Sequence, residues 1–228
     1  MHAGRGRPLT RNTSTPGPFR GILPKLTLTR TETSRMIRVA IILGSTRPGR
    51  RGEAVARWVH DLAAQRTDAT FELVDLADYN LPLYDEPNPP VHGKYTKEHT
   101  KVWSAKIASF DAFVLVTPEY NHGPSGALKN ALDFLYNEWV DKAAGFVGYG
   151  GAGGTRAVEQ LRLVMAELQV ATVRNQVALS LRTDFENFST FKPGDHQQKV
   201  LHGMLDQLVA WGGALAHLRA ARAAKPAT

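Results

Sequence analysis

The sequence predicts an α/β domain built on a doubly wound sheet of five parallel strands, in the order 2-1-3-4-5, with helices on both faces. Five apolar runs alternate with five segments of helical periodicity, and several of these runs are nearly continuous, as in strands buried on both faces. Polar or glycine-rich loops follow the first, third and fourth strands, which are neighbours in this order. Such sheets bind ligands beyond the carboxyl ends of the strands, where the strand order reverses.

Hydrophobic periodicity predicts the elements of the first half of the domain. In order, they are strand 39–43, helix 54–62, strand 70–75, helix 97–110 and strand 111–117. Residues 77–94 form a long irregular segment with several prolines and glycines. A loop of this length in a compact domain usually has a function, so we expect a lid or an interface. In the alternative interpretation, Tyr84 simply packs the segment down.

The second half alternates in the same way. It contains a helix 125–135 capped by Ser125, strand 143–148, helix 155–168, strand 171–179 and a last helix from 195 to about 218. A polar linker before the last helix carries Phe185, Phe188 and Phe191, which we expect to pack. Residues 219–228 are alanine-rich and basic, and we expect them to be a frayed tail.

Most of the positive charge precedes the predicted domain. The formal net charge is +7, and residues 1–35 hold seven Arg or Lys against one Glu, which gives +6 and leaves +1 (7 − 6) for the rest. We expect residues 1–35 to be a disordered basic extension. It is either a nucleic-acid or targeting arm or, in the interpretation we favour, a non-functional extension, because Met36 directly precedes the first strand. The near-neutral domain offers no basic groove, so we do not expect a nucleic-acid partner.

The composition excludes several kinds of chemistry. The chain has no cysteine, which excludes disulfides, thiolate nucleophiles and iron–sulfur clusters and is compatible with a cytoplasmic location. Its eight histidines show no paired ligand spacing, so we expect no metal. No apolar run approaches the roughly 20 residues that a membrane span requires, so we expect no membrane partner.

The loop after the first strand predicts a phosphate site. Residues 44–52 read Gly-Ser-Thr-Arg-Pro-Gly-Arg-Arg-Gly and lead into a helix. Three arginines at a helix start are unfavourable next to the positive end of the helix dipole. A bound anion would compensate for their charge, so we expect one there. The alternative is a plain strand-to-helix turn whose Gly, Ser and Thr serve only capping. No lysine follows the glycines, which argues against a nucleotide triphosphate loop.

The loops after the third and fourth strands suggest a flat ligand. Residues 118–123 read Pro-Glu-Tyr-Asn-His-Gly, and residues 149–154 read Tyr-Gly-Gly-Ala-Gly-Gly. Small residues let a planar group approach the backbone, and a phosphate site beside such a slot suits a singly phosphorylated ring such as FMN. Residues 148–153 also match G-x-G-x-x-G, but no acid for a ribose follows about 20 residues later.

These stretches, together with Gly-Ala-Leu-Lys-Asn-Ala-Leu-Asp at 126–133, resemble the NAD(P)H-dependent FMN reductase family. That family has a flavodoxin-like fold and includes flavin, quinone and azo reductases. The resemblance covers about residues 36–180. It implies a flavodoxin-like FMN-binding domain, here residues 36–218, with NADPH or NADH as hydride donor, a small-molecule electron acceptor, and assembly as a homodimer or homotetramer.

The resemblance also implies which residues bind. The phosphate would be held in the stretch Gly44, Ser45, Thr46, Arg47, Arg50, Arg51 and Gly52. The isoalloxazine ring would be lined by Pro118, Glu119, Tyr120, Asn121, Gly150 and Gly151. An interface near the flavin would contain Tyr84, Lys129 and Asn130. No catalytic side chain is implied, because the hydride chemistry resides on FMN.

The sequence therefore predicts an FMN-dependent NAD(P)H oxidoreductase. A flavodoxin-type electron carrier without NAD(P)H oxidase activity of its own is the alternative. Such carriers are usually acidic, whereas the predicted domain is close to neutral.

Overall fold

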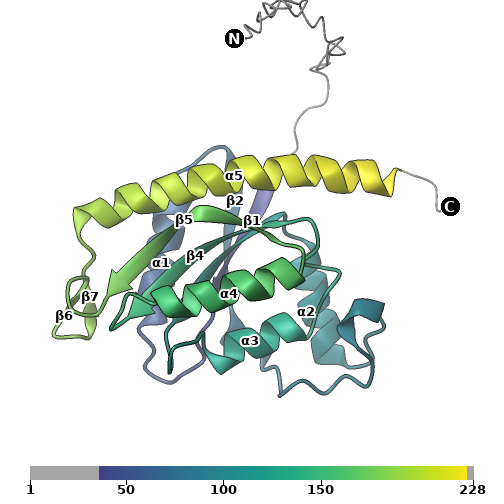
Figure 1. The fold of residues 1–228 in the computed structure, drawn as a ribbon, viewed down its shortest axis with the longest axis horizontal. Helices are drawn as coiled ribbons and strands as arrows, with labels where there is room; N and C mark the ends of the chain where they lie inside the picture. Colours follow the sequence, from purple (N-terminus) through teal and green to yellow (C-terminus); the bar gives the residue numbers. More distant parts are fainter. Residues whose placement is uncertain (1–35, 225–228) are drawn as a thin grey trace, which may run out of the picture. The chain divides into compact units, whose positions relative to one another are not determined.

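The computed structural model describes residues 36–224, so the predictions for residues 1–35 and for the end of the tail lie outside the described residues. Five strands form one all-parallel sheet in the order β2-β1-β3-β4-β5 (Figure 1). This confirms the predicted fold class and strand order. The strands are β1 (Ile37–Leu43), β2 (Ala69–Asp75), β3 (Ala112–Pro118), β4 (Ala143–Gly150) and β5 (Ala171–Ser180).

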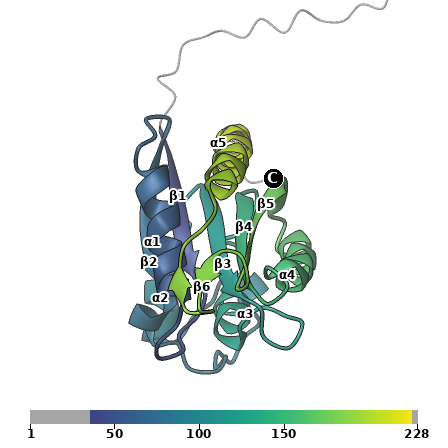
Figure 2. The same cartoon turned by 90° about the vertical axis from the view of Figure 1, so that its left-hand side faces the viewer.

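Helices cover both faces of the sheet (Figure 2). Helices α1 and α5 pack on one face, and α2, α3 and α4 pack on the other. Val39 and Ile41 of β1 point to the first face and Ala40 and Ile42 to the second, and all four are fully buried. Burial on both sides explains the continuous apolar run. The helices are α1 (Gly52–Ala63), α2 (Glu98–Ala108), α3 (Gly126–Asp133), α4 (Thr155–Glu167) and α5 (Asp195–Ala223).

The segment 77–94 is less irregular than its composition suggests. It contains the end of one short 3₁₀ helix, η1 (Leu76–Tyr79), and the whole of another, η2 (Pro90–His92). Asn80 and Gly93, which follow these turns, both adopt left-handed backbone conformations. The segment is thus built from two tight turns joined by extended chain.

Helix α5 continues to Ala223 rather than ending near Leu218. Arg219 donates a hydrogen bond of 2.6 Å to the backbone carbonyl of Asp141 and pairs with the carboxylate of Asp111. These contacts tie the last turns of the helix to the amino-terminal end of the sheet. The alanine-rich, basic composition suggested fraying because the acidic partners lie far away in the sequence.

The linker before α5 forms a small hairpin that the sequence did not predict. Strands β6 (Phe185–Glu186) and β7 (Thr190–Phe191) pair antiparallel. As expected, Phe185 and Phe191 pack, with ring centroids 5.1 Å apart, and Phe191 also contacts Trp58 of α1. Phe188 departs from that expectation, because it lies exposed in the turn with a positive φ. Within residues 36–224, none of the helices has the length and apolar character that crossing a bilayer demands.

Candidate functional site

Three loops meet at the carboxyl end of the sheet, as the strand order requires. We define loop one as residues 44–51, loop three as 119–125 and loop four as 151–154. The Gly44 N–H donates to the Val116 carbonyl at 2.9 Å, and the Ser125 hydroxyl donates to the Gly44 carbonyl. On the other side, the Glu119 N–H donates to the Tyr149 carbonyl at 3.1 Å. The three predicted loops therefore form one continuous rim.

Helix α1 begins at this rim without a side-chain cap. Its N-cap residue is Arg51, whose side chain makes no capping hydrogen bond. The first N–H groups of a helix have no partner inside the helix, and together with the helix dipole they attract an anion. Ser45 lies buried at the same rim, and its hydroxyl is 3.2 Å from that of Tyr120.

Tyr149 also reaches this helix start, although sequence reasoning assigned it no role. It is the penultimate residue of β4, and its side chain is only 5% exposed. The Tyr149 hydroxyl interacts with Ser45 and lies so close to Gly52 that a Cβ at position 52 would collide with it. Burial is the main factor that raises the pKa of Tyr149, so the hydroxyl stays protonated and able to donate. In the sequence, Tyr149 is marked only by its position between a predicted strand and a glycine-rich loop.

The three arginines of loop one have different environments. The guanidinium of Arg50 pairs with both carboxylate oxygens of Asp75, at the end of β2, and donates to the Ser45 carbonyl at 2.6 Å. Arg47 and Arg51 instead line a cavity of about 160 Å³. We call it the rim cavity; its other lining residues are Pro118, Glu119, Tyr120, Tyr149, Gly150 and Leu181.

The rim cavity fits a phosphate group. The Nε of Arg51 is buried and has no hydrogen-bond partner within residues 36–224. A buried unsatisfied donor is costly, and an oxygen anion would satisfy it. The uncapped start of α1, two arginines and the Ser45 hydroxyl point to the same kind of ligand.

In loop three, the side chain of Glu119 is bound to the start of α4. The Glu119 carboxylate accepts a hydrogen bond of 3.1 Å from the Arg156 N–H and pairs with the Arg156 guanidinium, at the start of α4. Burial raises the pKa of Glu119, but the bonds and charge of Arg156 outweigh burial and hold this pKa below its ordinary value. The carboxyl is therefore ionised near neutral pH. Asn121 and His122 form the left-handed turn of the loop.

Small residues keep the other wall open. Gly150 ends β4 rather than lying in the loop, and a Cβ there would lie 3.3 Å from the Glu119 Cβ. At Gly151 a Cβ would meet no atom within 4 Å, so this position borders open space. Tyr120, which lines the rim cavity together with Gly150, is 39% exposed. A flat group can approach the backbone here.

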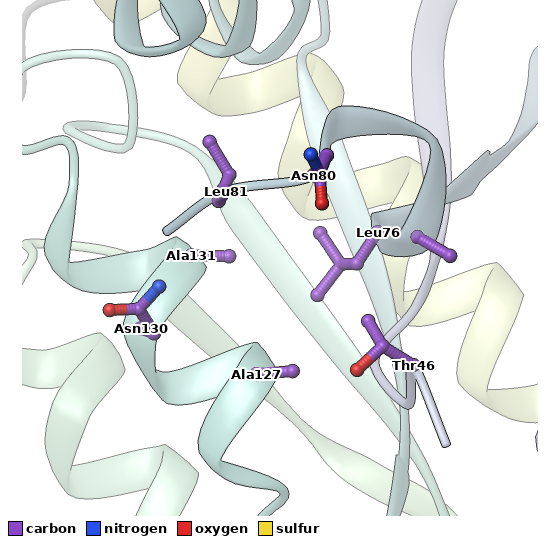
Figure 3. A pocket seen from close by; sticks show the side chains of 8 residues that line it. Thr46, Leu76, Asn80, Leu81, Ala127, Asn130 and Ala131 are labelled. Atoms are coloured by element: carbon purple, nitrogen blue, oxygen red, sulfur yellow. The ribbon is translucent and has the colours of Figure 1, made fainter. Parts of the chain in front are cut away.

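A second cavity lies between loop one, η1 and α3 (Figure 3). It measures about 280 Å³, and we call it the lateral pocket. Thr46 lines it, whereas the next residue, Arg47, lines the rim cavity. The other lining residues are Leu76, Ala77, Asn80, Leu81, Ala127, Asn130 and Ala131. Thr46 is thus the one member of the predicted phosphate set that these two cavities place apart from Arg47 and Arg51.

Of the residues predicted at an interface, Lys129 and Asn130 belong to α3, and Tyr84 lies in the segment 77–94. Asn130 accepts a hydrogen bond from the Tyr84 N–H at 3.0 Å and donates to the Pro82 carbonyl at 2.7 Å. Asn130 and Tyr84 are therefore brought together. Lys129 instead pairs with Asp133, one turn along the same helix. Among the residues that the structure describes, no group of three or more His, Asp or Glu side chains has the arrangement of a metal site.

Comparison with known proteins agrees with this geometry. Residues 37–184 match the family model described as NADPH-dependent FMN reductase. An NAD(P)H-dependent FMN reductase of Nectria sp. is 42% identical over 176 residues, which cover 72% of this chain and 87% of the relative. Another, from Schizosaccharomyces pombe, is 38% identical over 186 residues, which cover 81% of this chain and 86% of the relative.

A solved structure supports the fold. FerB, a flavoenzyme NAD(P)H:(acceptor) oxidoreductase from Paracoccus denitrificans, matches with a TM-score of 0.62 and 23% identity. The match covers 78% of this chain and 97% of FerB. At this level of identity, the likeness establishes the shared flavodoxin-like architecture.

Proposed function

This chain belongs to the NADPH-dependent FMN reductase family, and from that premise we propose that it is an FMN-dependent NAD(P)H oxidoreductase. It takes a hydride from NADPH or NADH and delivers electrons to a small flavin, quinone or azo acceptor. The single observation that carries the proposal is the rim cavity, which Arg47 and Arg51 line at the uncapped start of α1 and where the buried Nε of Arg51 has no partner in the described chain.

The phosphate of FMN would be held at loop one. Ser45, Arg47 and Arg51 supply a hydroxyl and two positive charges, and the backbone from Arg50 to Gly52 supplies N–H groups. The Arg50 side chain contributes indirectly, because its ion pair with Asp75 and its bond to the Ser45 carbonyl fix the loop. Thr46 and Gly44 complete the loop, and Gly44 also lets loop one pass close to β3.

Loops three and four would line the flat ring. The backbone of residues 118–121 and of Gly150 and Gly151 offers polar groups without bulk. Bound FMN supplies the redox chemistry, which is hydride uptake from the nicotinamide and reduction of the acceptor. The chain's own groups position the reactants, exclude water and stabilise negative charge through backbone N–H groups. Glu119 is ion-paired and ionised, so it is not a proton donor in this scheme.

Loading and turnover test the proposal. Purified protein titrated with FMN should quench flavin fluorescence and turn yellow, and it should then oxidise NADPH or NADH in the presence of quinone, azo or flavin acceptors. A yellow protein that oxidises neither nicotinamide with any acceptor would favour the flavodoxin-type carrier. A colourless protein that cannot be loaded with FMN would overturn the proposal.

We further propose a homodimer, or a homotetramer of such dimers, that contacts its partner through α3 and the segment 77–94. Leu83 supports this surface because it is 86% exposed, and Val91 is 49% exposed nearby in the sequence. We propose a cytoplasmic location, in line with the absence of cysteine.

A further inference from the structure

The hydroxyl of Tyr149 lies at the start of α1, a position where helix N–H groups attract anions. It touches Gly52, the first residue of α1, and it lines the rim cavity together with Arg47 and Arg51. A side chain larger than hydrogen at position 52 would displace it. The Tyr149 hydroxyl therefore lies against the start of α1, where Arg51 is the N-cap residue.

The polar groups at this helix start are not satisfied by the described chain alone. The buried Nε of Arg51 has no partner there, and α1 has no side-chain cap. The Ser45 hydroxyl is 3.2 Å from the Tyr120 hydroxyl and also interacts with the Tyr149 hydroxyl. A hydroxyl carries one proton and two lone pairs, so Ser45 can accept from one tyrosine and still donate elsewhere. The three hydroxyls and the Nε of Arg51 together offer several donors at the start of α1.

We propose that the Tyr149 hydroxyl is a direct ligand of the FMN phosphate and that it makes the site select FMN over riboflavin. The inference rests on the proposed function and adds a residue that the family resemblance did not assign. Hydrogen bonds to a charged acceptor are stronger than neutral ones, so the contact favours the phosphomonoester. Riboflavin ends in a neutral hydroxyl and gains little from the same donor.

Replacing Tyr149→Phe removes the hydroxyl and keeps the packing of the ring. We expect the Kd for FMN, measured by flavin fluorescence quenching, to rise about tenfold or more. The Kd for riboflavin should change less than about twofold, so the ratio of the riboflavin Kd to the FMN Kd falls at least about fivefold. If Tyr149 had only a structural role, the substitution would raise the Kd for FMN and the Kd for riboflavin to a similar extent.

Tyr136→Phe is the matched control. Its hydroxyl donates to the Glu167 carbonyl at 3.1 Å, at the opposite end of α4 from the rim. This variant should lower stability without changing the preference for FMN. Thermal unfolding with inorganic phosphate is a second test that does not need flavin. Phosphate should raise the Tm of the native protein, and it should raise the Tm of Tyr149→Phe less.

The outcomes distinguish failure of the role of Tyr149 from failure of the proposed function. If the native protein binds FMN and Tyr149→Phe keeps the same ratio of FMN to riboflavin affinity, the inference is wrong and the proposed function stands. If the native protein binds no FMN but phosphate protects it and Tyr149→Phe loses that protection, the proposed function fails and the anion site with Tyr149 stands. Equal phosphate protection in both proteins would reject the tyrosine as a ligand.

Discussion

At the scale of single residues, the three arginines of loop one divide into two groups. Like charges at a helix start repel each other and the dipole, yet one of the three is neutralised. The side chain of Arg50 is 14% exposed and ion-paired with Asp75, which leaves Arg47 and Arg51 for the rim cavity. In the sequence the three arginines look equivalent. In the structure, Arg50 holds the loop instead of facing the rim cavity.

Arg47 offers a test of the hydride donor. We propose that Arg47, besides its place at the FMN phosphate, also pairs with the extra phosphate of NADPH. With FMN saturating, Arg47→Ala should then raise the KM for NADPH about tenfold and the KM for NADH about twofold or less, because NADH lacks that phosphate. Steady-state kinetics at saturating FMN measure both constants. Arg57→Ala is the matched control, since Arg57 is exposed on α1 and pairs with Glu53. An unchanged preference between the two donors would contradict a role for Arg47.

At the scale of elements, polar contacts tie the middle of the segment 77–94 to α3 and to the start of α2. Asn130 of α3 binds Pro82 and Tyr84. The buried carboxylate of Glu86 accepts hydrogen bonds from the N–H groups of Thr96 and Lys97 at 2.8 and 2.9 Å. Glu86 thereby satisfies N–H groups at the start of α2, whose N-cap Lys97 has no side-chain cap of its own.

This contact predicts an acid-sensitive stability. Burial raises the pKa of Glu86, but the hydrogen bonds from Thr96 and Lys97 outweigh it and lower the pKa from 4.5 to about 2. The contribution of the carboxylate is thus complete above pH 4.5 and is lost as the pH falls towards 2. Glu86→Gln should lower the free energy of unfolding at pH 7 by about 1–2 kcal/mol.

Denaturant unfolding at several pH values measures this effect. The difference between native protein and Glu86→Gln should shrink as the pH falls from 4.5 to 3. Glu159→Gln, an exposed change in the middle of α4, is the control and should behave like the native protein. A difference for Glu86→Gln that stays constant with pH would show that the charge of Glu86 is not the cause.

At the scale of the whole described domain, two separate cores lie on either side of one sheet, and α5 runs the length of the first. The helices leave few large apolar side chains exposed, and two leucines stand out. Leu83, in the segment 77–94, is 86% exposed, and Leu163, on α4, is 74% exposed. Only Leu83 lies on the surface that we propose for self-association.

The two leucines allow a paired test of assembly. We expect Leu83→Glu to shift the protein towards monomer in size-exclusion chromatography with light scattering, because it places a charge in an apolar contact. Leu163→Glu makes the same change on a different surface and should leave the mass unchanged. If Leu163→Glu alone dissociates the assembly, the interface lies on α4 rather than on α3 and segment 77–94.

The sequence by itself determined the fold class, the strand order and the position of the three loops on one rim. It could do so because strands buried on both faces are continuous apolar runs, and because tight turns need glycine or proline. These signals are local, and each is complete within a short stretch.

Only the tertiary structure decided which groups face the rim cavity. Arg50 meets Asp75, Ser45 meets Tyr120, and Tyr149 meets Gly52 across the sheet. The end of α5 and the anchor at Glu86 depend in the same way on partners outside their own elements. Such contacts leave no periodic pattern in the chain, because they arise only when the sheet brings distant segments side by side.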